Sequence, residues 1–301
     1  MHLQRKSIMA NWLQAARIPS QLYLALSLLM GHALYFENWG YLNWSLVIGF
    51  GLFGICLQLY IVFGNDVADF ETDKLNQTST IFSGGSRVLV EKALSIKQLK
   101  KAYFLMLSLS LCLGTILSIY CQSKQVFLLT LVALLLLWMY SYPPIKLSYR
   151  GGGEILQAIG LGLILPCMAF IGQGGQGIPL DIMLALIPSH LACAIGTSLA
   201  DEPSDRLSQK RTFTVIFGQY QASFAVAILQ GISTLLLLAL DIKFVSTNFQ
   251  MFSAYFLGLM IIYLFFIQAK PGEVAMNLKI FISILYTQSL VGVIIWSSLY
   301  R

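Results

Sequence analysis

The stretch that decides the fold runs from residue 44 to residue 73 and reads WSLVIGFGLFGICLQLYIVFGNDVADFETD. Its first two thirds are almost entirely apolar, and its last third is rich in acids (Asp66, Asp69, Glu71, Asp73). About 20 consecutive apolar residues are enough for a helix to cross a bilayer. The stretch therefore predicts a membrane-spanning helix that brings a cluster of carboxylates to one membrane surface.

The composition of the whole chain agrees with this prediction. Of the 301 residues, 57% are hydrophobic and 11% are charged, whereas a soluble domain carries about 25% charged residues. A single soluble core cannot bury so much hydrocarbon and still present a polar surface to water. The composition therefore predicts an integral membrane protein.

Nine segments are apolar enough to cross the membrane as helices. They lie at about 19–36, 42–64, 102–121, 125–142, 153–171, 181–200, 219–240, 249–268 and 277–298. We therefore expect an all-α protein, with about nine transmembrane helices in one bundle around a central cavity.

The first acidic motif follows the second predicted span. Asn65, Asp69 and Asp73 are spaced four residues apart, and Asp66 lies three residues before Asp69. If the helix continues, these four side chains lie on or near one face of it. Repulsion among the carboxylates would destabilise an isolated helix, so we expect a cation nearby.

The second acidic motif follows the sixth predicted span, in the sequence ADEPSDRLSQKRT at residues 200–212. Asp201 and Asp205 are again four residues apart. Pro203 fits the first turn of a helix but not its interior. We therefore expect the span to end near Ala200 and a new turn to begin at Pro203.

Basic residues predict the orientation of the spans. With the N-terminus inside, the inside segments hold 16 Lys and Arg residues, and the outside segments hold only Lys124, Lys243 and Arg301. Cytoplasmic loops are enriched in Lys and Arg. We therefore expect the N-terminus and both acidic motifs on the cytoplasmic side, and we attribute the net charge of +6 to topology. A nucleic-acid partner is not indicated.

Two carboxylate clusters on the same side of the membrane could share a metal site. Mg²⁺ prefers carboxylate oxygens and commonly shares its coordination shell with substrate phosphates. Bound between the clusters and a diphosphate, it would neutralise the charge that develops as a carbon–oxygen bond breaks, and Lys and Arg would add donors. The alternative is that the acids are solvated helix ends. The helical spacing, repeated after a second span, favours the metal site.

The motifs resemble those of a known family. NDVADFETD at residues 65–73 resembles the NDxxDxxxD motif of the UbiA superfamily of intramembrane prenyltransferases, and DEPSD at 201–205 resembles its DxxxD motif. The sequence from Tyr142 to Lys146 resembles the family's YxxxK element, and Arg17 resembles the basic start of its first helix. These motifs follow the family's order from about residue 17 to 218.

The resemblance implies an enzyme that transfers a prenyl group from a polyprenyl diphosphate to an aromatic acceptor with the help of Mg²⁺. It implies a single transmembrane domain at residues 1–301, with loops at about 65–101 and 201–218 capping the active site. The implied metal-binding residues are Asn65, Asp66, Asp69, Asp73, Asp201 and Asp205. The implied catalytic residues are Asp69, Asp73, Asp201, Asp205 and Lys146, and the implied diphosphate-binding residues are Asn65, Arg17, Tyr142, Lys146, Lys210 and Arg211.

Two stretches resemble the menaquinone branch of the superfamily, which prenylates 1,4-dihydroxy-2-naphthoate. They are DxxxDRxxxKRT, from Asp201 to Thr212, and YPPIKLSYRGGGE, from Tyr142 to Glu154. Gln209 stands where that branch tends to have glycine. The same chemistry on 4-hydroxybenzoate, homogentisate, haem or a glycerol-phosphate lipid therefore stays open.

Polar side chains within spans usually face the interior of a bundle. Gln58, Glu154 and His190 are candidates for the acceptor pocket, and interhelical hydrogen bonding is the alternative role. A transporter is the alternative class of protein, but transporters place ionisable groups near the bilayer midplane. Here the acids lie at the ends of spans. We therefore expect a multi-pass enzyme of the cell (inner) membrane whose active site faces the cytoplasm.

Overall fold

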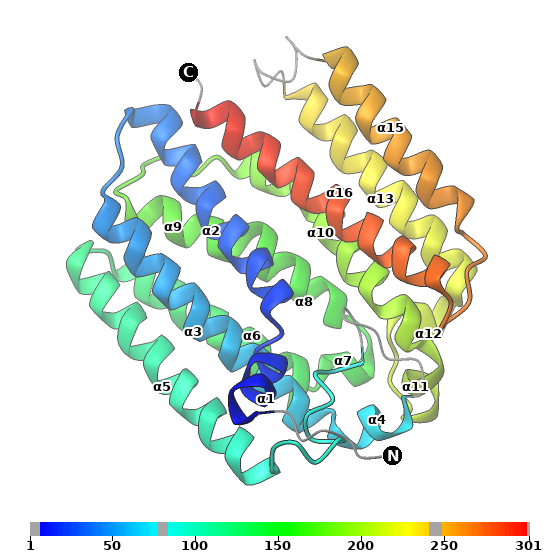
Figure 1. Cartoon of the computed structure of the whole chain (residues 1–301). Helices are drawn as coiled ribbons and strands as arrows, with labels where there is room; N and C mark the ends of the chain where they lie inside the picture. Colours follow the sequence, from blue (N-terminus) through cyan, green and yellow to red (C-terminus); the bar gives the residue numbers. More distant parts are fainter. Residues whose placement is uncertain (1–6, 77–83, 241–248, 300–301) are drawn as a thin grey trace.

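The computed structural model describes residues 7–76, 84–240 and 249–299. Within these ranges the chain is built from helices and contains no strand, which confirms the predicted all-α class. Figure 1 shows the long helices lying side by side in one bundle.

Every predicted span coincides with helical structure. The long helices are α2 (Ile18–Trp39), α3 (Trp44–Ala68), α5 (Ile96–Tyr120), α6 (Lys124–Ser141), α10 (Leu180–Ser198), α13 (Gln219–Ala239), α15 (Phe249–Phe265) and α16 (Val274–Leu299). The fifth predicted span is formed in three consecutive pieces: α8 (Gly153–Ile159), a π-helical turn (Gly160–Ile164) and α9 (Leu165–Gly172).

Seven helices within the described ranges are long and apolar enough to cross a membrane, so the protein is an integral membrane protein. Helix α2 is not among these seven, and in the part of α15 whose side chains the structure describes, the apolar segment is Ala254–Phe265. Figure 1 places α1 (Ile8–Ala15) and the end of α16 at opposite ends of the bundle, as an odd number of crossings requires. The count of nine stays a prediction.

Short helices gather at one end of the bundle (Figure 1). They are α1, α4 (Phe70–Leu75), α7 (Leu147–Arg150), α11 (Glu202–Leu207) and α12 (Phe213–Phe217). Helices α4 and α11 carry parts of the first and second acidic motifs, and the two helices contact each other. The two motifs therefore lie at the same end of the bundle.

The first acidic motif does not lie on one unbroken helix, as its spacing suggested. Helix α3 ends at Ala68, Asp69 leaves the helical conformation with φ −97° and ψ 7°, and α4 begins at Phe70. An unbroken helix would stack like charges four residues apart. The backbone N–H groups of Asp69 and Asp73 still donate to the carbonyl oxygens four residues earlier, so the motif bends at Asp69 without separating its acids.

The second motif begins as Pro203 suggested. Helix α10 ends at Ser198, a 3₁₀ turn covers Leu199–Asp201, and α11 begins at Glu202. Pro203 thus occupies the first turn of α11, where its missing N–H group leaves no helical hydrogen bond unmade.

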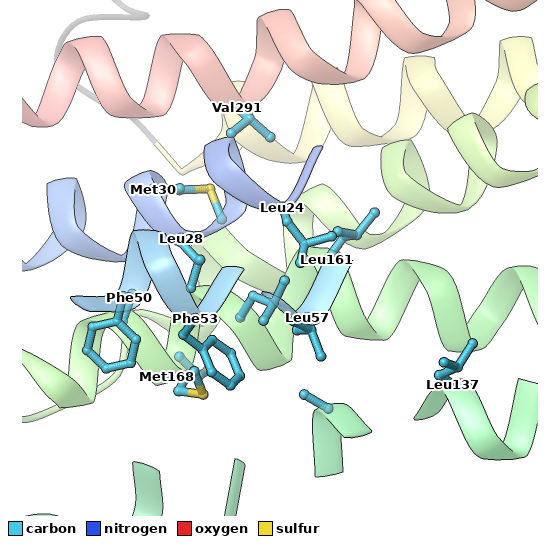
Figure 2. Close-up of a cluster of buried hydrophobic side chains, with 14 of the residues drawn as sticks. Leu24, Leu28, Met30, Phe50, Phe53, Leu57, Leu137, Leu161, Met168 and Val291 are labelled. Carbon is cyan, nitrogen blue, oxygen red and sulfur yellow. The ribbon is translucent and has the colours of Figure 1, made fainter. Parts of the chain in front are cut away.

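The apolar core lies where α2, α3, α9 and α16 meet. Figure 2 draws Leu28 and Met30 of α2, Phe53 of α3, Met168 of α9 and Val291 of α16 as members of one buried apolar cluster. Helices α2 and α9 approach closely at Gly31, because a Cβ atom there would fall on the carbonyl oxygen of Pro166. Small residues permit such close contacts between membrane helices.

Lys279 is one of the 16 basic residues that the charge count assigns to inside segments. Its side chain is fully buried within α16. The ammonium group donates to Ser223 Oγ and to the carbonyl oxygen of Ile267, at 2.9 Å from the latter. A carbonyl oxygen at or just past a helix end has no hydrogen-bond donor within the helix. Lys279 supplies a donor for the carbonyl oxygen of Ile267, beyond the end of α15.

We predict that Gly31→Ala destabilises the protein by about 1–3 kcal/mol, because the added methyl group forces α2 away from α9. Thermal unfolding in detergent measures the effect. Gly51→Ala in α3 is the matched control, because nothing lies within 4 Å of a Cβ atom there. Equal melting temperatures for the two variants would contradict the close approach at Gly31.

Candidate active site

The end of the bundle that carries the short helices encloses a cavity of about 300 Å³. Its lining includes charged and amide side chains from both acidic motifs and their neighbours: Arg17, Asn65, Asp69, Asp73, Asn76, Asp201, Asp205 and Lys210. Leucines line other parts of it: Leu24, Leu57, Leu137, Leu161 and Leu165. Since Leu57 precedes Asn65 by about two helical turns on α3, the cavity runs from the acidic motifs into the apolar interior.

Lys210 joins the two acidic motifs. Its ammonium nitrogen lies 2.9 Å from Asp69 Oδ2 and 3.6 Å from Asp205 Oδ1. Burial disfavours the charged ammonium, but Asp69 and Asp205 outweigh this effect and raise the pKa of Lys210. Lys210 therefore supplies the cation that the carboxylate spacing required.

Arg17 neutralises the buried end of α3. It stands between α1 and α2 in the left-handed conformation, with φ 44°. Its guanidinium forms an ion pair with Asp66, which also accepts hydrogen bonds from the hydroxyl and the backbone N–H of Ser86. Burial opposes its charge, but Asp66 and Asp73 raise the pKa of Arg17 overall.

Asp201 ties the second motif to the segment that follows the first. One carboxylate oxygen accepts from Asn76 Nδ2 at 2.8 Å, and the other accepts from the backbone N–H of Gly84 at 3.2 Å. Arg87 supports the same segment by donating to the backbone oxygens of Asp73 and Asn76. The two motifs are thus held together by backbone and amide donors as well as by Lys210.

Asp73 is the least compensated acid of the cavity. Burial, followed by the charge of Asp69, raises the pKa of Asp73 to about 7. Within the described residues it has no ion-pair partner. Gly85 packs against its carboxylate at φ 73°, where a Cβ atom would collide with it. The cavity therefore holds more negative charge than its own cations neutralise.

The donors of this cavity fit a hard divalent cation such as Mg²⁺. Asn65, Asp69, Asp73, Asp201 and Asp205 offer amide and carboxylate oxygens, the ligands that Mg²⁺ prefers. In the part of the chain that the structure describes, no three His, Cys, Asp or Glu residues form a ready group for a metal ion. Several of the acids are instead bound to protein donors such as Lys210 and Asn76.

Some residues implied by the motifs lie outside the cavity lining. Asp66 is buried behind the lining, where its carboxylate accepts hydrogen bonds from Arg17 and Ser86. The hydroxyl of Tyr142 donates to the backbone oxygen of Gly64 at 2.8 Å, so it is directed at α3. Their roles in binding stay predictions.

Two predicted phosphate-binding cations are also placed away from the lining. The ammonium nitrogen of Lys146 lies 3.4 Å from the ring centroid of Tyr149. Arg211 is exposed, although it directly follows the cavity residue Lys210. Gln209, before Lys210, has φ 60°, a conformation that explains why glycine suits this position.

Of the three candidates for the acceptor pocket, two line the cavity and one does not. Gln58 lines the cavity and donates to Ser20 Oγ at 2.7 Å. Glu154 also lines it and accepts from the backbone N–H of Phe213 at 2.7 Å, which anchors the start of α12. His190 is buried against Gly162 and is not part of the lining.

Three aromatic residues of the site escaped sequence reasoning. Tyr23 and Tyr140 line the cavity, and the hydroxyl of Tyr149 lies 3.2 Å from Asp69 Oδ1. Tyr140 and Tyr149 flank the YxxxK element, which is the one available signal. Nothing in their spacing distinguishes them from the other tyrosines, of which the chain has 14 in all.

Fold and cavity define a polytopic membrane protein with an acidic site at one end of a helical bundle. The model of the UbiA prenyltransferase family matches residues 24–285, so the chain belongs to that family and is a prenyltransferase. No curated protein matches the chain by sequence.

Solved structures share the fold. A UbiA homologue from Archaeoglobus fulgidus bound to DMAPP and Mg²⁺ is 18% identical with a TM-score of 0.72, over 97% of this chain and 100% of that one. The apo UbiA homologue from Aeropyrum pernix K1 is 16% identical with a TM-score of 0.66, over 91% and 96%. A digeranylgeranylglyceryl phosphate synthase structure is 14% identical with a TM-score of 0.59, over 98% and 99%.

We predict that Lys210→Gln destabilises the protein by about 3 kcal/mol, because it leaves Asp69 and Asp205 buried without their cation. The loss, measured by thermal unfolding in detergent, should shrink when Mg²⁺ is added. Arg206→Gln is the control, because Arg206 forms an exposed pair with Glu202 that contributes little. Equal stability of the two variants without metal would contradict a central role for Lys210.

Proposed function

We propose that this prenyltransferase transfers a polyprenyl group to an aromatic acceptor in a Mg²⁺-dependent reaction, and that the acceptor is 1,4-dihydroxy-2-naphthoate, a step of menaquinone biosynthesis. The observation that carries the transfer chemistry is the single cavity that joins both aspartate motifs, Arg17 and Lys210 to an apolar interior. Anionic and hydrocarbon parts of one substrate would find matching surroundings there.

The polar residues of the cavity suit a diphosphate. Asn65, Asp69, Asp73, Asp201 and Asp205 would hold Mg²⁺, which when bound would neutralise the departing diphosphate. Arg17 and Lys210 would donate hydrogen bonds to phosphate oxygens. Arg17 and Lys210 already pair with the carboxylates of Asp66 and Asp69. When a diphosphate binds, its oxygens would replace these carboxylate oxygens as acceptors.

The leucine-lined part of the cavity suits the prenyl chain. Leu24, Leu57 and Leu161 come from three different helices and line one continuous space with the acids. Water excluded from this space cannot capture an allylic cation before the acceptor does. The aromatic rings of Tyr23 and Tyr140 in the lining would stabilise such a cation by cation–π contact.

The acceptor would lie beside Gln58 and Glu154, the polar lining residues that belong to neither acidic motif. Support for naphthoate comes from the motif stretches shared with the menaquinone branch, Asp201–Thr212 and Tyr142–Glu154. Lys146, Tyr142 and Arg211 of these stretches would reach the diphosphate if their side chains reoriented. The archaeal homologue's complex with DMAPP and Mg²⁺ supports the donor side of the proposal and leaves the acceptor to experiment.

The distribution of basic residues supports a cytoplasmic site in the cell (inner) membrane. Of the 19 Lys and Arg residues, 16 fall in segments on the side of the acidic motifs. Polyprenyl diphosphate and the acceptor would then enter from the cytoplasm and the surrounding lipid, and no nucleic-acid partner is involved.

We expect Asp69→Ala and Asp201→Ala each to lower prenyl transfer by about 100-fold or more, because each removes a carboxylate from the charge-stabilising site. The assay uses purified enzyme, labelled prenyl diphosphate and Mg²⁺, and chelation of the metal should abolish turnover. Glu71→Ala is the matched control, because this acid of the same motif is exposed and pairs with Lys74. Wild-type turnover in both aspartate variants would disprove the metal-site assignment.

We expect 1,4-dihydroxy-2-naphthoate to give the highest kcat/KM in a screen with 4-hydroxybenzoate, homogentisate, haem and glycerol-phosphate lipids as competing acceptors. Product analysis by mass spectrometry identifies the prenylated compound. A preference for another acceptor would overturn the menaquinone assignment and leave the transfer chemistry standing. No product with any acceptor would disprove the proposed transfer.

A further inference from the structure

Tyr149, on the one-turn helix α7 within the stretch Tyr142–Glu154, binds the centre of the first acidic motif although it belongs to neither acidic motif nor to the YxxxK element. Its hydroxyl lies 3.2 Å from Asp69 Oδ1 and 2.8 Å from Thr72 Oγ1. A tyrosine hydroxyl can both donate and accept a hydrogen bond, so Tyr149 can bind both neighbours at once. Because an ionised carboxylate can only accept, Tyr149 donates to Asp69, and Thr72 can donate to Tyr149.

This hydrogen bond fixes the Asp69 carboxylate from one side. Asp69 is the residue at which α3 ends and before which α4 has not yet begun. Oδ1 is bound by Tyr149, and Oδ2 is bound by Lys210 at 2.9 Å. Tyr149 and Lys210 thus hold the Asp69 carboxylate between them, one on each oxygen.

The ring of the same tyrosine lies under two ammonium groups. Lys146 Nζ is 3.4 Å from the ring centroid, and Lys210 Nζ is 5.2 Å from it. Both distances are within the range of cation–π attraction. Lys146 lies outside the cavity lining. The ring of Tyr149 holds its ammonium group beside the site, and the same ring contacts Lys210, the cation that bridges both motifs.

We propose that Tyr149 is a positioning residue of the prenyl-transfer site: its hydroxyl orients Asp69 for the metal, and its ring orients Lys146 and Lys210 for the diphosphate. This inference rests on the proposed function. The two tasks belong to different parts of the side chain: the hydroxyl contacts the carboxylate of Asp69, and the ring contacts the two ammonium groups. Partners behind a metal ligand change metal affinity when they are removed, typically by 10-fold or more.

Two substitutions separate these tasks. Tyr149→Phe removes the hydroxyl and keeps the ring, and Tyr149→Leu removes both. Isothermal titration calorimetry on the full-length protein in detergent gives the affinity for Mg²⁺ in the presence of a non-hydrolysable prenyl diphosphate analogue, and for the analogue at saturating Mg²⁺. Thermal unfolding of each variant reports stability independently of ligand binding.

We expect Tyr149→Phe to weaken Mg²⁺ binding by about 10-fold with little change in affinity for the analogue. Tyr149→Leu should in addition weaken binding of the analogue by about 2- to 10-fold, because both lysines lose their platform. Tyr220→Phe is the control, because this tyrosine is exposed on α13, and it should bind both ligands as the wild type does.

The outcomes distinguish this inference from the proposed function. Wild-type Mg²⁺ affinity in Tyr149→Phe would overturn the positioning role while the wild-type protein still binds metal and analogue. Equal losses of both affinities in the two variants, accompanied by equal losses of thermal stability, would show a merely structural residue and also overturn it. If the wild-type protein bound neither ligand, the proposed function would fail, and the inference with it.

Discussion

The structure depends on the balance between buried carboxylates and the few cations that reach them. Four acids of the two motifs, Asp66, Asp69, Asp73 and Asp205, are buried at one end of an apolar bundle, where uncompensated charge is expensive. Lys210 and Arg17 offset part of this cost through direct ion pairs. The compensation is incomplete at Asp73, whose raised pKa reflects it. A site with too little positive charge favours a bound metal ion. The same buried carboxylates therefore require ion pairs for a stable fold and attract the metal ion to the reactive site.

The arrangement of helices serves this balance. Long helices pack closely at points such as Gly31 and leave a cavity only where the motifs meet the leucines. The helices that carry the charges are short and interrupted, with breaks at Asp69 and before Glu202. A continuous helix would hold the acids of the first motif in a single repelling row. Arg17 pairs with Asp66, and Lys210 pairs with both Asp69 and Asp205, whereas Asp73 forms no ion pair among the described residues.

The sequence predicts the fold better than the site. Apolar runs of about 20 residues locate every predicted span, because hydropathy along one segment needs no knowledge of its neighbours. The distribution of Lys and Arg also predicts both acidic motifs on one side of the membrane. The sequence cannot foresee that Asp69 breaks α3, that Lys279 turns inward, or that Tyr149 contacts Asp69. Those features depend on which segments meet in space, and the 80 positions between Tyr149 and Asp69 leave no local pattern. The cations Lys146 and Arg211 illustrate the same limit, because a motif gives a residue's identity but not the direction of its side chain.

The bond between Lys210 and Asp69 joins residues 141 positions apart, and that distance has a consequence for biogenesis. A chain emerging from the ribosome inserts the helix that carries Asp69 long before Lys210 has been synthesised. Until then, the first acidic motif must stay hydrated at the membrane surface, since no protein cation of the second half exists to accompany it inward. Closure of the site is therefore a late event of assembly, after the sixth predicted span has entered the bilayer. An incompletely inserted chain would expose these acids at the membrane surface without Lys210.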